Sequence, residues 1–199
     1  MKSTTLPLFK KTKRLILRPL ELHDFENWSQ AYSSMLPPQN QFDETNWVDS
    51  ELTKAKFKAL LKKQLHGHAL DRVYSFGVFL KDDGLLIGEV FIGNIHRTSS
   101  QNGILGYRIF NNYWNHGFAT EACSAALQIA FKDLRLHRVE ANIEPTNKAS
   151  LKVAKKIGLK KEGFSSKRLF ENKKWLDMIN FAATCEDYGI KYKFPPKQK

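Results

Sequence analysis

The chain of 199 residues is 42% hydrophobic and 12% aromatic, which is enough for one folded core and excludes an intrinsically disordered protein. Its 32 Lys and Arg against 20 Asp and Glu give a net charge of +12, which fits polyanionic partners such as RNA, the ribosome or a phosphate-rich cofactor, and fits equally a soluble basic protein without them. Apolar runs stay well short of the roughly 20 residues of a membrane span, and the N-terminal segment lacks the apolar core of a secretory signal.

The cysteines limit the possible sites further. Cys123 and Cys185 are too few for a disulfide framework, and neither stands in a CxxC or Cys/His metal pattern. We therefore expect reduced thiols, a cytoplasmic location, no metal ion and no membrane partner.

The first half of the chain predicts a strand, two helices and a hairpin. In order, these elements are a strand over 13–20, helices over 22–32 and 45–64, and strands over 73–81 and 85–95. Asp24 is the expected cap of the first helix, and Gly67 is expected to end the second or form its last turn. The polar turn that ends at Gly84 joins the two strands of the hairpin.

The second half predicts alternating strands and helices. They are a strand over 103–110, a helix over 118–134, a strand over 138–144, a helix over 147–157, and strands over 163–170 and 175–183. The order β-α-α-β-β-β-α-β-α-β-β predicts an α/β fold with a mixed sheet and helices on its faces. The β-α-β unit over 103–144 supplies a parallel crossover.

Two segments carry the chemistry. YWNHGFATEA (residues 113–122) turns from a strand through Gly117 into a helix, whose first backbone N–H groups and positive dipole end favour a pyrophosphate. About thirty residues later, VEANIEP is followed by Asn147, Ser150 and a short basic helix that ends at Gly158.

Five blocks in this order resemble the GCN5-related N-acetyltransferase (GNAT) superfamily. They are RLILRPL, LLIGEVFIGNI, LGYRI followed by YWNHGFATEA, HRVEANIEPTNKAS and KKIGLKKEG. The closer likeness is to the RimJ/RimL-type ribosomal-protein alanine N-acetyltransferases. The resemblance implies the GNAT fold over residues 12–184, with basic tails at 1–11 and 185–199. Trp114 departs from the usual Arg or Gln, as in the RimJ/RimL branch, and Asn115-His116 replaces a common Gly and basic or amide pair.

The resemblance implies an enzyme that moves acetyl from acetyl-CoA to a primary amine. Backbone N–H groups of residues 116–120 would receive the pyrophosphate, and Ile109-Phe110 would pair with the pantetheine arm while one of their N–H groups polarises the thioester carbonyl. The cofactor-binding candidates are Ile109, Phe110, Asn115, His116, Gly117, Phe118, Ala119, Thr120, Asn147, Ser150 and Lys155. Lys148, Lys152 and Lys156 share a helix face, which is either solvated or contacts the ribose phosphate.

Candidate catalytic residues are Ser150, Glu89 and Tyr107. Ser150 matches the family serine near the sulfur, where its hydroxyl can donate to the departing thiolate. Asn147 matches a family contact to the cofactor arm, and helix capping is an alternative or additional role for it. Glu89, Tyr107 and Glu144 lie on strands expected to line the acceptor groove. Glu89 could equally face the other side of its strand and be an ordinary surface carboxylate. Glu121 is expected to stabilise the helix dipole.

The sequence leaves two classes of acceptor amine and one non-catalytic function as alternatives. A protein N-terminus, most naturally of a ribosomal protein, suits the branch; a polyamine or aminoglycoside is the rival substrate, and a non-catalytic basic RNA- or ribosome-binding module is the rival function. Basic termini and the lysines over 54–63 would suit docking on RNA. Five side chains could line the groove or merely pack: Trp28, Tyr32, Trp47, Arg168 and Trp175.

Overall fold

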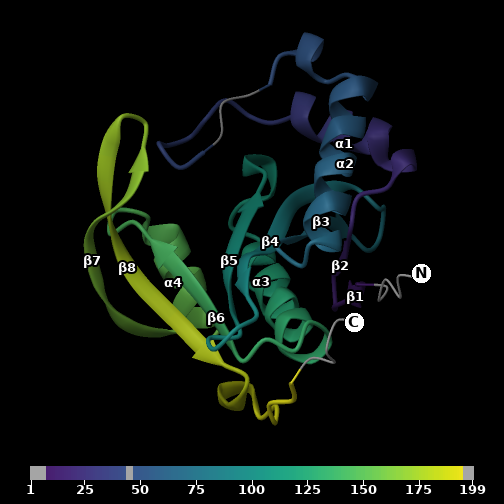
Figure 1. Cartoon of the computed structure of the whole chain (residues 1–199). Coiled ribbons are helices and arrows are strands. Elements are labelled where there is room, and N and C mark those ends of the chain that lie inside the picture. The colour runs from purple at the N-terminus through teal and green to yellow at the C-terminus, as the bar shows by residue number, and fades with distance from the viewer. Residues whose placement is uncertain (1–7, 44–46, 195–199) are drawn as a thin grey trace.

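Residues 8–43 and 47–194, which the computed structural model describes, form one eight-stranded mixed sheet flanked by four α-helices (Figure 1). The strands are β1 (Lys10–Lys11), β2 (Leu15–Arg18), β3 (Tyr74–Leu80), β4 (Leu86–His96), β5 (Asn102–Ile109), β6 (Arg138–Ile143), β7 (Lys160–Glu171) and β8 (Lys174–Thr184). The helices are α1 (Phe25–Ser33), α2 (Lys54–Ala69), α3 (Phe118–Gln128) and α4 (Lys148–Lys156). The predicted α/β class and element order are confirmed, with β1 as an addition.

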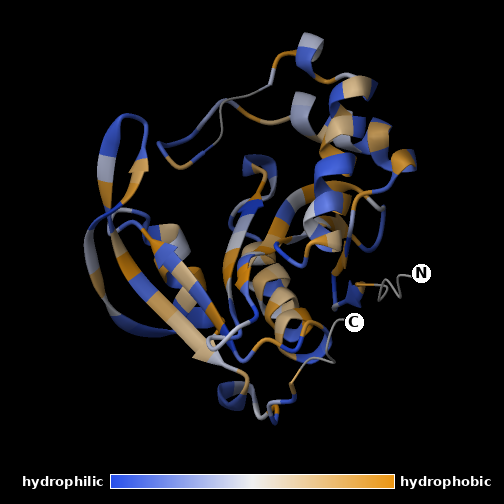
Figure 2. Cartoon of the chain, in the orientation of Figure 1, coloured by the Kyte–Doolittle hydropathy of each residue, from blue (hydrophilic) through white to orange (hydrophobic). Residues whose placement is uncertain are grey.

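Two apolar clusters pack on opposite faces of the sheet. Alternation along β2 shows the division, because Leu15 and Leu17 join the cluster of α3 and α4, whereas Ile16 packs against the cluster of α1 and α2. Trp28 of α1 and Leu127 of α3 are fully buried in their respective clusters. Helix α3 is apolar over most of its length, as a helix covering the middle of a sheet must be (Figure 2).

The sheet opens between β5 and β6. Its strands follow the order β1-β2-β3-β4-β5-β6-β8-β7, and β5 and β6 are the parallel pair of the predicted crossover. Only Asn102–Ile104 pair with Arg138–Glu140; beyond them β5 continues to Ile109 and β6 to Ile143 without pairing to each other. The carboxyl ends of these two strands therefore diverge (Figure 1).

Three expected helix ends need correction. The expected start of the second helix, Thr45, lies outside the described residues, and α2 begins at Lys54, where the Thr53 hydroxyl accepts from the Lys56 N–H. Helix α2 runs past Gln64 to Ala69, with Gly67 inside its last turn. A glycine is needed at this position because a Cβ atom would stand 2.4 Å from Val73 Cγ1. Helix α3 ends at Gln128 and widens into a π turn over Ile129–Asp133.

Asp24 is the N-cap residue of α1, as the sequence predicts, but its side chain makes no capping hydrogen bond to the helix. It precedes α1, but its carboxylate accepts from both terminal nitrogens of Arg18, each at 2.6 Å. Burial acts to raise the pKa of Asp24, and the hydrogen bonds from Arg18 and from the Glu21 backbone outweigh it, so the pKa is lowered.

The two expected tails partly belong to the folded body. Leu8 is buried and β1 pairs with β2, while Cys185 is buried and Tyr192 packs against the main core. Residues 1–7 and 195–199 lie outside the described residues. Within the described ranges, every helix is too short or too polar to cross a membrane.

Candidate active site

The divergence of β5 and β6 forms a large cavity. It has a volume of about 1130 Å³ and is walled by the loop before α3, by α4, by residues 40–43 and by the hairpin of β7 and β8. A smaller cavity of about 240 Å³ adjoins it between α4 and the strands. Tyr107, Asn147 and Ser150 line both, so these side chains stand where the two cavities meet.

The loop before α3 presents backbone N–H groups to the large cavity. Asn115 and Gly117 have positive φ, 64° and 78°, and Gly117 is the N-cap of α3. Glycine adopts this left-handed backbone conformation without strain, and the first turn of α3 begins beside the gap between β5 and β6. The cavity is lined here by Trp114, Asn115, Gly117, Phe118, Ala119 and Thr120. This arrangement fits an anionic group at a helix N-terminus.

His116 differs from its neighbours. Its exposed ring stacks on Phe118, with ring centroids 5.6 Å apart, and its Nδ1 lies 2.7 Å from the Trp114 carbonyl oxygen. The side chain does not line the cavity. His116 is therefore held on the outer side of the loop, where its imidazole supports the turn.

Strand alternation determines which backbone N–H groups at the end of β5 point toward the gap between β5 and β6. The Phe110 N–H donates to the Ile87 carbonyl at 2.9 Å, so it is used inside the sheet and Phe110 itself is buried under α1. Adjacent residues of a strand direct their N–H groups to opposite sides, which aims the Ile109 N–H into the gap. Trp114 Nε1 donates to the Ile109 carbonyl at 2.6 Å. Of the two predicted pantetheine contacts, Ile109 therefore has the appropriate orientation and Phe110 does not.

Asn147 and Ser150 take the places that the sequence indicated. The Asn147 side-chain oxygen accepts from the Ser150 N–H at 3.0 Å, which confirms the capping role and leaves the amide nitrogen at the cavity wall. Across the cavity junction, the Tyr107 hydroxyl donates to Ser150 Oγ at 3.1 Å. Burial raises the pKa of Tyr107, so its hydroxyl stays protonated and Ser150 can turn its own hydrogen toward the cavity.

Of the lysines of α4, the cofactor-binding candidate Lys155 lies off the cavity wall. Lys148, Lys152 and Lys156 line the large cavity, as their spacing of four predicts. Lys155 does not line it and is exposed. One residue of an α-helix rotates the side chain by about 100°, which carries Lys155 away from the face of Lys156.

Glu89 lies under α1 and not on the wall of either cavity. It is the cross-strand neighbour of Arg108 and accepts from the Tyr32 hydroxyl at 3.0 Å. Arg108 in turn donates to the Tyr32 hydroxyl and lines the large cavity. Burial raises the pKa of Glu89. The sequence pattern did not indicate Arg108, although its position on a strand two residues before Phe110 places it beside the predicted cofactor edge.

Glu121 connects α3 to the N-terminal strands. Its carboxylate accepts from Thr12 Oγ1 at 2.6 Å and from the Arg14 backbone and Nε, both at 2.8 Å. The same guanidinium donates to the His116 carbonyl at 2.9 Å and lies over the Phe118 ring at 4.5 Å. A residue expected to stabilise a helix dipole thus also fixes the turn before α3. Nothing local in the sequence links partners 107 positions apart.

The predicted acceptor-groove side chains are dispersed. Trp28 and Tyr32 are buried, Trp47 packs partly buried beside them, and Arg168 and Trp175 are exposed outside the cavities. The large cavity is lined instead by other side chains of the loop over 40–43, of the segment after β6 and of the last hairpin, among them Phe42, Asp43, Glu144, Glu171 and Leu176. The groove was expected between the first two helices and the last hairpin. Of these elements only the hairpin lines the large cavity, and the loop over residues 40–43 lies there in place of α1 and α2.

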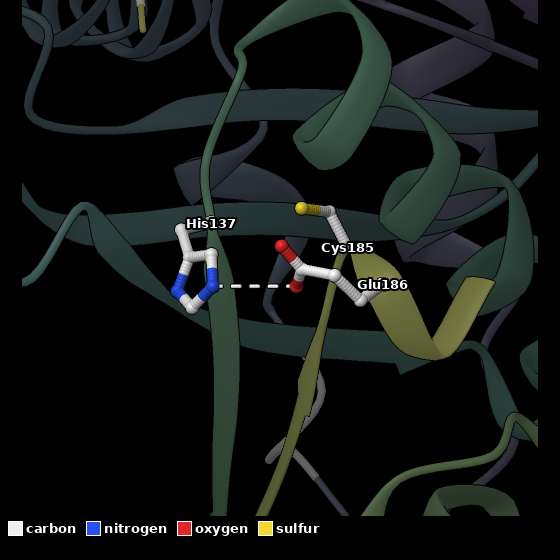
Figure 3. Close-up of side chains that lie close together, drawn as sticks. All are labelled: His137, Cys185 and Glu186. Atoms are coloured by element: carbon white, nitrogen blue, oxygen red, sulfur yellow. Dashed lines mark ion pairs between the residues drawn. The ribbon is translucent and has the colours of Figure 1, made fainter. Parts of the chain in front are cut away.

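Three side chains with the donor atoms of a metal site lie at the amino end of β6 and just after β8. His137, Cys185 and Glu186 have ligand atoms within 4.8 Å of one another, and Nε2 of His137 lies 3.3 Å from a Glu186 oxygen (Figure 3). Burial and the Glu186 carboxylate raise the pKa of the Cys185 thiol to about 11, so the thiol is protonated at neutral pH in the metal-free cluster. The cluster joins the start of β6 to the turn after β8.

Comparison with known proteins agrees with this geometry. The family model described as an acetyltransferase (GNAT) domain matches residues 14–160. A probable N-acetyltransferase of Bacillus subtilis, YjcK, is 32% identical over 84% of this chain and 92% of its own length. The [ribosomal protein uS5]-alanine N-acetyltransferase of Escherichia coli is 31% identical over 61% of this chain and 62% of its own.

Structural similarity extends further along the chain. The structure of Mycobacterium smegmatis RimJ in complex with CoA-disulfide covers 87% of this chain and 83% of its own with a TM-score of 0.72 at 24% identity. The likeness to RimJ/RimL-type enzymes is thereby confirmed for the fold, and acetyl-CoA is the co-substrate of this family. The chain belongs to the GNAT family of N-acetyltransferases.

Proposed function

We propose that this enzyme acetylates the N-terminal α-amine of a protein, specifically a ribosomal protein, in the cytoplasm. The observation that carries the proposal is the hydrogen bond from Tyr107 to Ser150 at the junction of two cavities, beside a helix N-terminus suited to a diphosphate. The likeness to the uS5-alanine enzyme supports the acceptor class.

Backbone N–H groups and side chains on both walls of the large cavity would bind acetyl-CoA. The first-turn N–H groups of α3 and Lys148, Lys152 and Lys156 would surround the phosphates. Ile109 would offer its N–H to the arm or the thioester carbonyl, where a preorganised donor stabilises the developing oxyanion. Asn147 would hold the arm from the opposite wall.

The transfer needs one proton donor and one proton acceptor. The amine nitrogen forms a bond to the acetyl carbonyl carbon while the carbon–sulfur bond breaks, and Ser150, backed by Tyr107, donates a proton to the leaving sulfur. The proton that the amine loses passes to water in the large cavity, because Glu89 and Tyr32 do not line that cavity.

An α-amine makes this chemistry easier than a lysine side chain would. With a pKa near 7.7–8.0, about one-seventh of α-amines are neutral at pH 7, against roughly one in 2,500 for lysine. A weakly activating site therefore suffices for an N-terminus.

Thiol release from acetyl-CoA, followed by mass spectrometry of the product, tests the acceptor. We expect turnover of peptides that begin with Ala or Ser, and none with the same peptides blocked by N-acetylation. Spermidine and an aminoglycoside serve as the small-amine comparison. Faster turnover of either small amine than of every peptide would reject the proposed acceptor, and no turnover with any amine would favour the non-catalytic reading.

A further inference from the structure

The hairpin of β7 and β8 exposes aromatic side chains on one face. Phe164, Phe170 and Trp175 are 56%, 58% and 59% exposed. Phe170 and Trp175 are cross-strand partners with ring centroids 5.3 Å apart, and Phe164 pairs with Ile179, which shares the Trp175 side of β8. Exposed apolar groups gathered on one element indicate an interaction surface. We name this surface, made by Phe164, Phe170 and Trp175, the aromatic face.

The same hairpin is strongly basic. It carries six cationic side chains against three acidic ones, and the cations are Lys160, Lys161, Lys167, Arg168, Lys173 and Lys174. Two of the acids are already engaged, because Glu162 pairs with Arg138 and Asp177 accepts from the Lys167 backbone N–H at 2.8 Å. Among the described residues, Lys161, Lys167, Arg168 and Lys173 have no ion-pair partner.

This combination favours a polyanion with planar groups over other partners. A second copy of the chain would bring two basic hairpins together, which like-charge repulsion opposes. A membrane surface would require an apolar tip, but the tip Glu171–Lys174 is hydrophilic (Figure 2). Phe170 and Trp175 are the strand residues that flank this tip. Single-stranded RNA offers phosphates to lysines and bases that stack on exposed rings.

We propose that the aromatic face binds a single-stranded segment of RNA. Bases stack on Trp175 and Phe170, and phosphates contact the exposed cations of the hairpin. Glu171, Asn172 and Lys174 at the tip line the large cavity, so RNA held here lies beside the mouth of the cavity and leaves its interior open. The inference goes beyond acetyl transfer and does not rest on it.

Fluorescence anisotropy of the full chain with a labelled single-stranded 12-mer of uridines and adenines, without acetyl-CoA or peptide, tests the proposal. We expect binding that weakens with salt, with a slope of log affinity against log salt of about −0.7 for each phosphate contacted. The double variant Phe170→Ala/Trp175→Ala should bind about tenfold or more weakly, because the bases lose both rings on which they stack. Its salt slope should stay unchanged.

The complementary variant Lys161→Gln/Lys173→Gln should reduce the slope by about 1.4, as loss of two phosphate contacts requires. Phe194→Ala is the matched control, because Phe194 is 75% exposed in another basic segment. Thermal melts confirm that each variant is folded. Equal binding by wild type and the double aromatic variant, equal loss in Phe194→Ala, or stronger binding to phosphatidylglycerol vesicles than to RNA would overturn the proposal.

Discussion

At the scale of single residues, the hydroxyl pair of Tyr107 and Ser150 gives the sharpest prediction. Ser150→Ala should lower kcat by about 100-fold with little change in the KM for acetyl-CoA, because general acids typically contribute 10²- to 10⁴-fold. Tyr107→Phe should cost about tenfold, since Ser150 remains to donate.

Steady-state thiol release at saturating acetyl-CoA measures both effects. Ser33→Ala, which removes an exposed hydroxyl of α1, is the control and should behave as wild type. A large rise in KM for Ser150→Ala at constant kcat would instead make Ser150 a binding residue.

At the same scale, short sequence motifs could indicate some of the candidate site residues but not the orientation of others. Gly117, Asn147 and Ser150 line the large cavity and were singled out because each stands in a short motif that encodes its own turn or cap. Phe110 and Lys155 were also singled out but do not line it, since motif spacing leaves the direction of an N–H group or a helix face undetermined. That direction depends on which neighbouring element the segment packs against, and this is a property of the whole sheet.

At the scale of elements, the link from β2 to α3 through Glu121 predicts a pH effect. Burial acts to raise the pKa of Glu121, but hydrogen bonds from Thr12 and Arg14 outweigh it and lower the pKa below 4.5. The resulting stabilisation is complete above the unfolded pKa and is lost as the pH falls through the folded pKa. Wild type should therefore lose more stability between pH 5 and 3 than Glu121→Gln does, as measured by urea unfolding.

The same variant should loosen the turn before α3, because the Arg14 guanidinium that Glu121 orients also holds the His116 carbonyl. We expect the KM for acetyl-CoA to rise about fivefold at pH 7 while kcat changes less. Glu26→Gln, on the exposed side of α1, is the control. An unchanged KM in Glu121→Gln would show that the turn holds its shape without this link.

Helix α4 offers a matched comparison of two lysines. Lys152 lines the large cavity and Lys155 does not, although both are lysines three residues apart on one helix. Lys152→Ala should weaken CoA binding by about five- to tenfold, up to ~1.4 kcal/mol, and Lys155→Ala should leave it unchanged. Titration calorimetry with CoA and with 3′-dephospho-CoA shows whether the ribose phosphate is the group contacted. Equal losses in both variants would point to a general charge effect.

At the scale of the molecule, acetyl-CoA should stabilise the fold. A ligand at a hundred times its Kd adds about 2.7 kcal/mol of stability, which for a chain of this size corresponds to a rise in Tm of about 5–10 °C. Acetyl-pantetheine, which lacks the diphosphate, should raise the Tm less, and equal shifts would argue against the helix N-terminus as the main anchor. Differential scanning fluorimetry measures the difference.

Element order and the place of the crossover could be predicted for the whole molecule because periodicity and turn residues are local signals. The contacts of Leu8, Cys185 and Tyr192 could not, because a short segment beside basic residues reads as a tail until the surface that it covers is known. The exposed rings of the last hairpin were likewise indistinguishable from core residues, since alternation along a strand does not reveal which face is covered.

The short pairing of β5 with β6 has a consequence for the lifetime of the enzyme. Three residue pairs hold these neighbours together, so the two flanks of the sheet depend on the helices to stay aligned. In the proposed mode of binding, the pantetheine arm of the coenzyme lies between β5 and β6 and joins them. Without acetyl-CoA, we expect the sheet to open first between these two strands and to become accessible to solvent and proteases there. We therefore expect acetyl-CoA to protect this enzyme from proteolysis as well as to supply its acetyl group.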